Sequence, residues 1–458
     1  MLRSTFLILF LLAFFAMGAA APFVMGLGYV WVSITKPQLL AYMILPSVPV
    51  AMIFGAATLL LYLTHDRRDP PKPDLLMVLL GLFALWFTAS TFLWAVVPEF
   101  AVTKWDWALK TILFTMFMPF IFRTRVQIEA FVQVYVIGLL AVFLPMGVKV
   151  ALSGGGYGQF LGLFIANTGL GEGATLAGVT VMSVPLALWL MRHGQLQPRW
   201  PIVRLAYLGV AVMAVLATVG TYQRTGLVGL VVLAAFAWWK TKRKILGAVL
   251  IAVGVGIAGW AASDRWEERM STITNYENEG SAMGRIRVWT WTWNYVLRNP
   301  LGGGFESYRI NSYEQPHPLR PDEILTVTGK AFHSIYFEVL GEQGFPGLAL
   351  LLAICAVTLL VQWRLARRFR KSAEHEWIHG LANALQVATV VLMVCGAFIG
   401  IGYQPWLYFL VGTTMCLHQH VRRLDAPAKR RPGTPAPAAR AAPPREAERR
   451  PQRQPEVV

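Results

Sequence analysis

The sequence predicts an all-α polytopic membrane protein, and three observations lead to this fold class. Hydrophobic residues make up 56% of the 458 residues, and charged residues make up only 14%. Apolar stretches of about 20 residues recur along the chain, each long enough to cross a hydrocarbon core of roughly 30 Å. Most Lys and Arg residues lie between these stretches or in the C-terminal tail. We therefore attribute the net charge of +17 to membrane topology, and we expect no nucleic-acid partner.

The apolar stretches give about twelve transmembrane helices, or thirteen if the first stretch divides. That stretch resembles a signal peptide up to residue 21, but its apolar character continues past Pro22, so we expect an uncleaved span. At about 45 Å it is too long for one upright helix, and it must tilt, break at Pro22 or form two short helices. The stretches are 5–34, 39–63, 75–98, 108–122, 128–150, 173–191, 203–220, 225–239, 245–262, 336–362, 380–402 and 405–419.

Basic residues fall on every second connection between the apolar stretches. By the positive-inside rule these connections are cytoplasmic, and the alternate connections face outward. The cytoplasmic set is 65–72, 123–125, 192–204, 240–244, 364–371 and the tail. The outward set is 99–107, 151–172, 221–224, 263–335 and 403–404.

This topology divides the chain into four parts. They are an N-terminal transmembrane bundle (1–262), an extracytoplasmic loop (263–335), C-terminal transmembrane helices (336–420) and a tail (421–458). The tail is rich in Pro, Ala and Arg, which predicts a disordered cytoplasmic segment. Its basic clusters either attract anionic membrane lipids or act only as a positive-inside anchor.

The long outward loop contains one amphipathic stretch. Its apolar side chains recur at spacings of three and four, which predicts a Trp-rich helix at the membrane interface. Asn299-Pro300 should end this helix, and a glycine turn follows. The stripe consists of Ile286, Trp289, Trp293, Val296 and Leu297.

Candidate functional residues gather on the outward side. His333 stands where the loop meets a span, within A-F-H-S-I-Y-F-E-V-L-G-E-Q-G-F-P-G-L. A lone histidine at such a boundary is more often a packing or interfacial residue than a catalyst. Three outward arginines, Arg224, Arg285 and Arg287, have the planar donor set that binds pyrophosphate. The alternatives are a headgroup contact for Arg224 and a solvated helix face for Arg287.

One metal-like pattern also occurs. H-E-W-I-H at 375–379 fits the zinc-protease pattern H-E-x-x-H, but it lies in a cytoplasmic connection without an evident third ligand. We interpret it as a chance match and expect no metal. The three cysteines, Cys355, Cys395 and Cys416, lie inside apolar stretches and indicate small core residues, with no disulfide framework.

The pattern His333-Ser334, nine residues, then Gly344-x-x-Gly347 resembles the signature of the O-antigen ligase and Wzy-type polymerase superfamily. Its members are polytopic membrane enzymes that move glycans from a polyprenyl-pyrophosphate carrier to an acceptor. They carry an outward Arg, often in S-R-G, where this chain has Q-R-T-G around Arg224. They carry a second Arg before a Trp-containing helix, and M-G-R-I makes Arg285 the better match than Arg287.

Five blocks in order narrow the resemblance to the O-glycosylation ligases associated with the exosortase A system of Gram-negative bacteria. This resemblance implies a multi-pass protein of the inner membrane with its active site facing the periplasm. The blocks are V-W-V-S-I-T-K-P, L-S-G-G-G-Y-G, G-T-Y-Q-R, E-G-S-A-M-G-R-I and the His333 stretch.

The resemblance implies a metal-independent glycosyltransferase without a cofactor. Arg224 and Arg285 would bind the pyrophosphate of the donor, and His333 would take the proton of the acceptor hydroxyl. Glu338 and Arg287 would orient the acceptor, although Glu338 could instead only cap local polar groups. The acceptor would be a protein, lipid A-core or another glycan. A Wzy-type polymerase is the alternative enzyme. A transporter of lipid-linked glycan is a third reading, with Lys149 and Arg204 as its only candidate charges near the midplane.

Overall fold

The computed structural model describes residues 2–40, 47–66, 68–153, 170–240, 244–245, 280–317 and 320–426. The predicted span 245–262 and the predicted disordered tail therefore lie almost wholly outside the described residues. Within them, thirteen α-helices and one β-hairpin form the fold. The helices are α1 (Leu2–Ala20), α2 (Pro22–Thr35), α3 (Val50–His65), α4 (Leu75–Leu93), α5 (Pro98–Ile121), α6 (Arg125–Ser153), α7 (Gly173–His193), α8 (Pro201–Gly220), α9 (Arg224–Lys240), α12 (Gly280–Arg298), α13 (Ile335–Arg368), α14 (Glu376–Gly396) and α15 (Pro405–Leu424).

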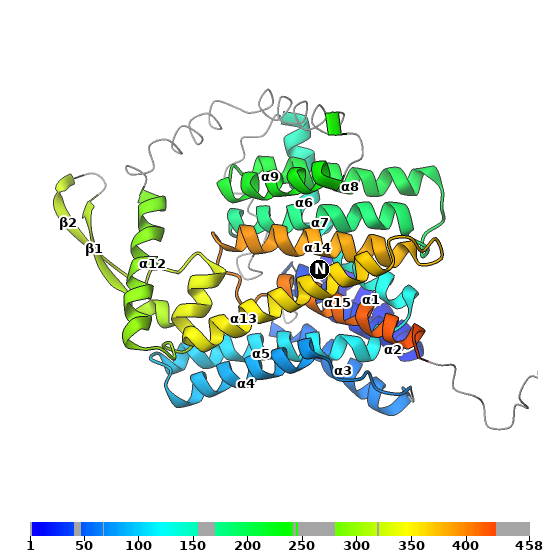
Figure 1. Cartoon of the computed structure of the whole chain (residues 1–458), viewed down its shortest axis with the longest axis horizontal. Helices are drawn as coiled ribbons and strands as arrows, with labels where there is room; N and C mark the ends of the chain where they lie inside the picture. Colours follow the sequence, from blue (N-terminus) through cyan, green and yellow to red (C-terminus); the bar gives the residue numbers. More distant parts are fainter. Residues whose placement is uncertain are drawn as a thin grey trace, which may run out of the picture.

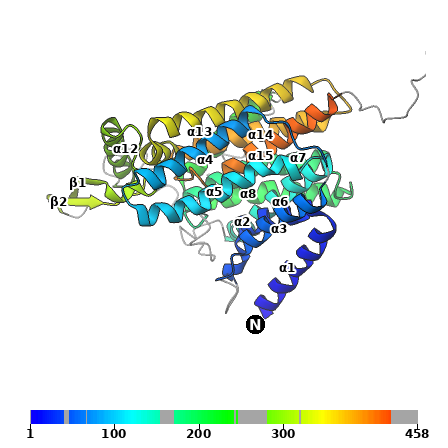
Figure 2. The ribbon, with the colours of Figure 1, turned by 90° about the horizontal axis from the view of Figure 1, so that it is seen from below.

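The helices form one bundle in which long neighbours lie side by side. Figure 1 shows α14 between α13 and α7, with α8 and α9 beyond α7 and with α4 and α5 on the opposite side. Seen after a quarter turn, α1, α2 and α3 lie along one flank (Figure 2). Helix α7 is the most enclosed, since it packs against α6, α8, α9 and α14 and buries most of its side chains.

Six of the described helices are long and apolar enough to cross a membrane, namely α4, α6, α7, α8, α13 and α14. Four shorter described helices, α1, α2, α3 and α9, are also apolar. These helices make the chain a multi-pass membrane protein, while the count of about twelve spans stays a prediction. The first apolar stretch divides into α1 and α2, because Pro22 begins a new helix after the extended Ala21.

One expectation about the connections was wrong. The expected outward connection 99–107 is instead the start of α5, because Pro98 occupies its first turn and Glu99 carries a favourable charge there. The long loop also contains an element that the sequence did not predict, because strands β1 (Ser312–His317) and β2 (Arg320–Thr328) pair as an antiparallel hairpin. The strands are short and largely polar, so their pairing left no clear apolar alternation in the sequence.

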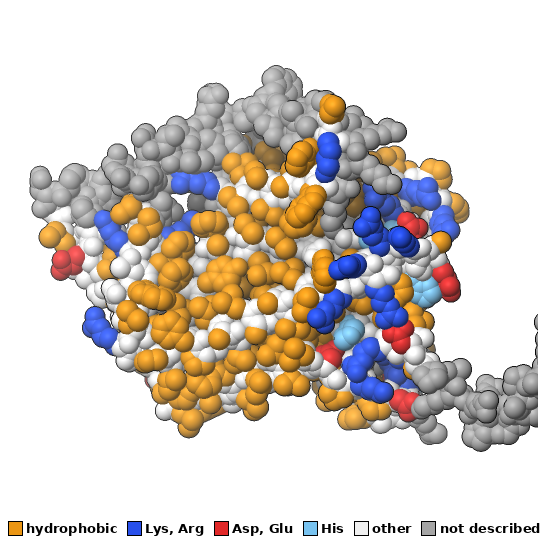
Figure 3. Space-filling model, in the orientation of Figure 1, with side chains coloured by type: hydrophobic (Ala, Val, Ile, Leu, Met, Phe, Trp, Pro, Cys, Tyr) orange, Lys and Arg blue, Asp and Glu red, His pale blue; other side chains and the backbone are white. Residues whose placement is uncertain are grey.

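Four of the predicted cytoplasmic connections, 65–72, 123–125, 192–204 and 364–371, meet at one end of the bundle, which we call the basic end. His420 Nδ1 lies 3.0 Å from the carbonyl oxygen of Arg123, and Gln419 donates to that of Lys72. Arg125 donates to the carbonyl oxygen of His193. Figure 3 shows Lys and Arg side chains gathered there, beside a broad hydrophobic flank. The opposite end carries α12 and the hairpin, and we call it the loop end.

Candidate functional site

His333 stands at the loop end, in the short segment between β2 and α13. Its backbone lies in the left-handed region with a φ of 49°, a conformation that costs a non-glycine residue about 1–3 kcal/mol. The flanking Phe332 and Ser334 are buried, and Trp289 Nε1 on α12 donates to the carbonyl oxygen of Phe332 at 2.8 Å. The backbone is thus held on both sides, while the His333 side chain stays 28% exposed.

Glu172 is the partner of this histidine. Its Oε1 lies 3.4 Å from His333 Nδ1, and its side chain is 44% exposed. Glu172 directly precedes the first residue of α7, where the unpaired backbone N–H groups of the helix favour a negative charge. Thr175 Oγ1 donates to its other oxygen at 3.1 Å. The carboxylate is therefore fixed in place, and one oxygen faces the imidazole.

Electrostatics keep Glu172 ionised. Partial burial raises the pKa of its carboxyl group, but the hydrogen bond and charge of His333, the Thr175 hydroxyl and the charge of Arg285 outweigh this effect. The pKa consequently falls below its usual range. Arg285 lies on α12, and its positive charge is one of the groups that lower the pKa of Glu172.

Arg224 emerges beside the same helix end. It is the first residue of α9, half-buried, after a three-residue turn from α8. In that turn, Gln223 packs on Gly173, so that a Cβ at Gly173 would lie 3.1 Å from Gln223 Nε2. The turn therefore sits on the residue that follows Glu172, which places Arg224 at the loop end.

The two arginines of α12 have different surroundings. Arg285 influences the Glu172 carboxylate, whereas Arg287 Nη1 donates to Gln315 Oε1 on β1 at 2.9 Å. Arg287 thus fastens α12 to the hairpin. This contact favours Arg285 over Arg287 as the ligand-binding arginine, and the acceptor-orienting role of Arg287 stays a prediction.

Glu338 belongs to a buried ion cluster instead of facing His333. Lys104 Nζ on α5 lies 2.7 Å from Glu338 Oε1 and 2.8 Å from Glu342 Oε1. The other oxygen of Glu338 accepts the backbone N–H of Gly402 at 2.8 Å. Both oxygens are therefore occupied, which favours the capping alternative for Glu338 over a role in orienting an acceptor.

The glycine signature Gly344-x-x-Gly347 lies at a kink in α13, and hydrogen bonds join this kink to the glycine turn that follows α12. Gly344 has φ 66° and ψ −165°, conformations that only glycine adopts readily, and it breaks the helical geometry of α13. Phe345 then donates to the carbonyl oxygen of Pro300 at 3.0 Å, and Pro346 has no N–H to donate. The carbonyl oxygens of Gly341 and Glu342 instead accept the N–H groups of Gly303 and Gly304, at 3.0 and 2.8 Å.

Gly347 allows the second half of this kink to dock on α4. A Cβ there would lie 2.1 Å from the Cβ of Gln343. Gln343 in turn accepts hydrogen bonds from α4, with Ser90 Oγ on its side chain at 2.6 Å and Trp86 Nε1 on its carbonyl oxygen at 2.9 Å. Both signature glycines therefore position the segment that follows His333.

Sequence reasoning missed Glu172 and Lys104. Glu172 is the single charged residue of the expected outward connection 151–172, and this isolation was the signal that could have identified it. Lys104 lay in the stretch taken for a loop. Its burial on α5 became apparent only once its carboxylate partners, more than 200 residues away, were brought beside it.

The H-E-x-x-H pattern lies at the opposite, basic end. His379 Nδ1 lies 2.6 Å from the carbonyl oxygen of Ala366, and His375 stacks on Phe369. Across the ranges that the structure describes, no three His, Cys, Asp or Glu side chains are placed to hold a metal ion. These contacts join both histidines to neighbouring residues of the basic end, and the interpretation of the pattern as a chance match stays a prediction.

The apolar helices and the polar site at their loop end define a polytopic membrane protein. Residues 208–352 match the family described as O-antigen ligase, and residues 2–195 match a family of unknown function (DUF5935). No curated protein matches the chain. Residues 208–352 therefore resemble an O-antigen ligase domain. His333, Arg224 and Arg285 lie within that domain, whereas Glu172 comes from the other matched segment.

Proposed function

We propose that this protein transfers a glycan from a polyprenyl-pyrophosphate carrier to an acceptor hydroxyl at the outer face of the bacterial inner membrane. One observation carries the proposal most directly. His333 of the O-antigen ligase domain pairs with the ionised Glu172, beside Arg285 and at the helix end where Arg224 emerges.

The position of Glu172 beside Nδ1 suits a general-base role for His333. With Nδ1–H donating to the carboxylate, Nε2 keeps its lone pair and can accept the proton of an acceptor hydroxyl. The negative charge then stabilises the imidazolium that forms. Which nitrogen carries the proton is an assignment that follows from the position of Glu172.

The transfer step balances with these groups alone. The acceptor oxygen forms a bond to the anomeric carbon, and the bond from that carbon to the diphosphate oxygen breaks. The proton goes to His333, and the electron pair leaves with the polyprenyl diphosphate. Arg224 and Arg285 bind the diphosphate and stabilise its growing charge. Attack opposite the leaving group inverts the anomeric centre, and the chemistry calls for neither a metal nor a cofactor.

The acceptor and the biological system form the finer part of the proposal. The five sequence blocks support O-glycosylation or glycan ligation linked to an exosortase system, with protein, lipid A-core or a glycan as acceptor. A Wzy-type polymerase would use the same donor and the same base. Mass spectrometry of the glycoconjugates lost on deletion would separate these outcomes, because a polymerase mutant retains conjugates that carry a single repeat unit.

A reconstituted transfer assay tests the proposal. Purified protein in proteoliposomes with carrier-linked glycan and an acceptor extract should produce a conjugate and free polyprenyl pyrophosphate. The His333→Ala variant should bind the donor but release neither product at a comparable rate. Movement of intact donor between leaflets, without release of polyprenyl pyrophosphate from the glycan, would instead indicate a transporter and would contradict the proposal.

A further inference from the structure

A second polar site lies at the basic end. It surrounds the C-terminal end of α7, whereas Glu172 lies at the N-terminal end of the same helix. A cavity of about 290 Å³ opens between α6, α7, the α7–α8 connection, α8 and the α13–α14 connection. Because α7 runs from Gly173, which follows Glu172, to His193, about 30 Å separates this cavity from the candidate transfer site. It therefore has no part in the proposed reaction.

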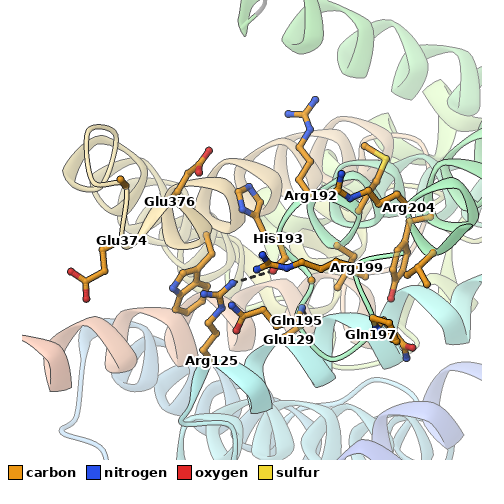
Figure 4. A pocket seen from close by; sticks show the side chains of 18 residues that line it. Arg125, Glu129, Arg192, His193, Gln195, Gln197, Arg199, Arg204, Glu374 and Glu376 are labelled. Atoms are coloured by element: carbon orange, nitrogen blue, oxygen red, sulfur yellow. Dashed lines mark hydrogen bonds between the residues drawn. The ribbon is translucent and has the colours of Figure 1, made fainter. Parts of the chain in front are cut away.

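Arginines dominate one side of the cavity. Figure 4 shows Arg125, Arg199 and Arg204 beside His193, each from a different part of the wall. The side chains of Arg199 and Arg204 have no hydrogen bond or ion pair to any described residue, and the buried Nε of Arg125 has no partner among them. Guanidinium groups that converge on one cavity, two of them without an ion pair to any described residue, suit a phosphate group.

A buried carboxylate oxygen supplies the second recognition element. Glu129 is only 1% exposed and lines the same cavity. Its Oε1 accepts the backbone N–H of Leu196 at 2.7 Å and also that of Gln195, but its buried Oε2 has no partner among the described residues. Because a buried unpaired carboxylate oxygen is unfavourable, a ligand that brings a cationic donor would satisfy it.

Charge balance decides between ligand types. The lining holds four arginines (Arg125, Arg192, Arg199 and Arg204) and three glutamates (Glu129, Glu374 and Glu376). Such a nearly neutral wall favours a zwitterion over a headgroup with several negative charges. The phosphate would face the arginines, and an ammonium group would face Glu129.

The rim of the cavity indicates that this zwitterion belongs to a lipid. Trp200, Ile202 and Leu205 are 64%, 64% and 61% exposed, and they flank Arg199 and Arg204 at the start of α8. Exposed Trp and aliphatic side chains beside arginines are typical of the boundary between headgroups and acyl chains. We propose that the cavity binds the headgroup of a phosphatidylethanolamine molecule in the leaflet at the basic end, the predicted cytoplasmic leaflet. Basic pockets between membrane helices commonly hold lipid headgroups at this depth.

Native mass spectrometry of the full chain, released from nanodiscs of phosphatidylethanolamine and phosphatidylglycerol in equal amounts, tests the proposal. The wild type should retain one phosphatidylethanolamine. The double variant Arg199→Ala/Arg204→Ala should bind it about tenfold more weakly or worse, because two charge-assisted contacts are lost. Arg370→Ala changes an exposed arginine at the same end outside the cavity, and it should bind the lipid as the wild type does.

Glu129→Gln tests the ammonium contact separately. Glutamine keeps an oxygen for the N–H groups of Gln195 and Leu196 but removes the charge, so the preference for phosphatidylethanolamine over phosphatidylglycerol should fall about tenfold. Unchanged preference in this variant would overturn the zwitterion assignment. Equal loss in Arg370→Ala, or displacement of the lipid by millimolar inorganic phosphate, would overturn the lipid site itself.

Discussion

The two ends of the bundle carry charge in opposite ways. At the basic end the arginines are numerous and many are exposed, as in the α7–α8 connection. At the loop end charges are fewer, and those of the site have partners close by: Lys104 lies between Glu338 and Glu342, and Glu172 faces His333. Exposed charges outside a cavity can serve topology with little demand on geometry, whereas paired charges at a membrane boundary have a fixed geometry that chemistry can use.

The largest difference in transfer rate should be between a variant of His333 at the loop end and a variant at the basic end. His333→Ala should lower the rate of transfer by about 10²- to 10⁴-fold, because it removes the proton acceptor. Donor binding should persist, since the arginines hold the diphosphate. His379→Ala at the basic end should transfer at the wild-type rate. A rate that falls with His379→Ala and not with His333→Ala would reverse the assignment of the two ends.

The arginines should follow in size of effect. Arg224→Lys keeps a cation but loses the two-pronged donor geometry, so it should impair transfer nearly as much as Arg224→Ala, on the order of 10- to 100-fold. Arg285→Ala should be more harmful than Arg287→Ala, because Arg287 contacts the hairpin through Gln315. Steady-state transfer rates at matched protein levels measure both comparisons. Wild-type turnover in Arg224→Ala would remove Arg224 from the site.

The kink offers a test of stability instead of chemistry. Gly344→Ala should lower the free energy of unfolding by about 2 kcal/mol or more, because its Cβ would lie 2.1 Å from the carbonyl oxygen of Pro300 and its backbone conformation suits only glycine. Gly209→Ala is the matched control, since a Cβ there meets no atom within 4 Å. Apparent melting temperatures in detergent should fall for Gly344→Ala and stay level or rise for Gly209→Ala. Equal melting temperatures would contradict the tight contact between the Gly344 kink and the glycine turn that follows α12.

The smallest effect concerns pH. The pKa of Glu172 is lowered in the folded protein, so its ionised form stabilises the fold. This stabilisation is fully present above the unfolded value of about 4.3 and is lost as pH falls through the lower folded value. The melting temperatures of wild type and Glu172→Gln should therefore differ most near neutral pH and converge as the pH falls through the lowered pKa of Glu172. A difference that grows on acidification would contradict the lowered pKa.

The sequence predicted those features that depend on local pattern. Apolar length predicted the helices, basic residues predicted which connections share one end, and the spacing of His333 from Gly344 predicted the importance of this segment. The sequence did not predict contacts between segments that are far apart in the chain. Lys104 and Glu342 are 238 residues apart, and Glu172 meets His333 across the boundary between two families. Periodicity and composition carry no information on such pairs, and a hairpin of polar strands leaves an equally weak pattern.

Single-turnover transfer by four proteins tests most directly whether Glu172 and His333 act as one unit. These proteins are the wild type, Glu172→Gln, His333→Ala and the double variant. If Glu172 acts only by orienting and stabilising His333, Glu172→Gln should slow transfer strongly in the wild-type background and have almost no further effect once His333 is gone. Transfer at the wild-type rate in Glu172→Gln, or a double variant whose loss is the product of the two single losses, would contradict the account.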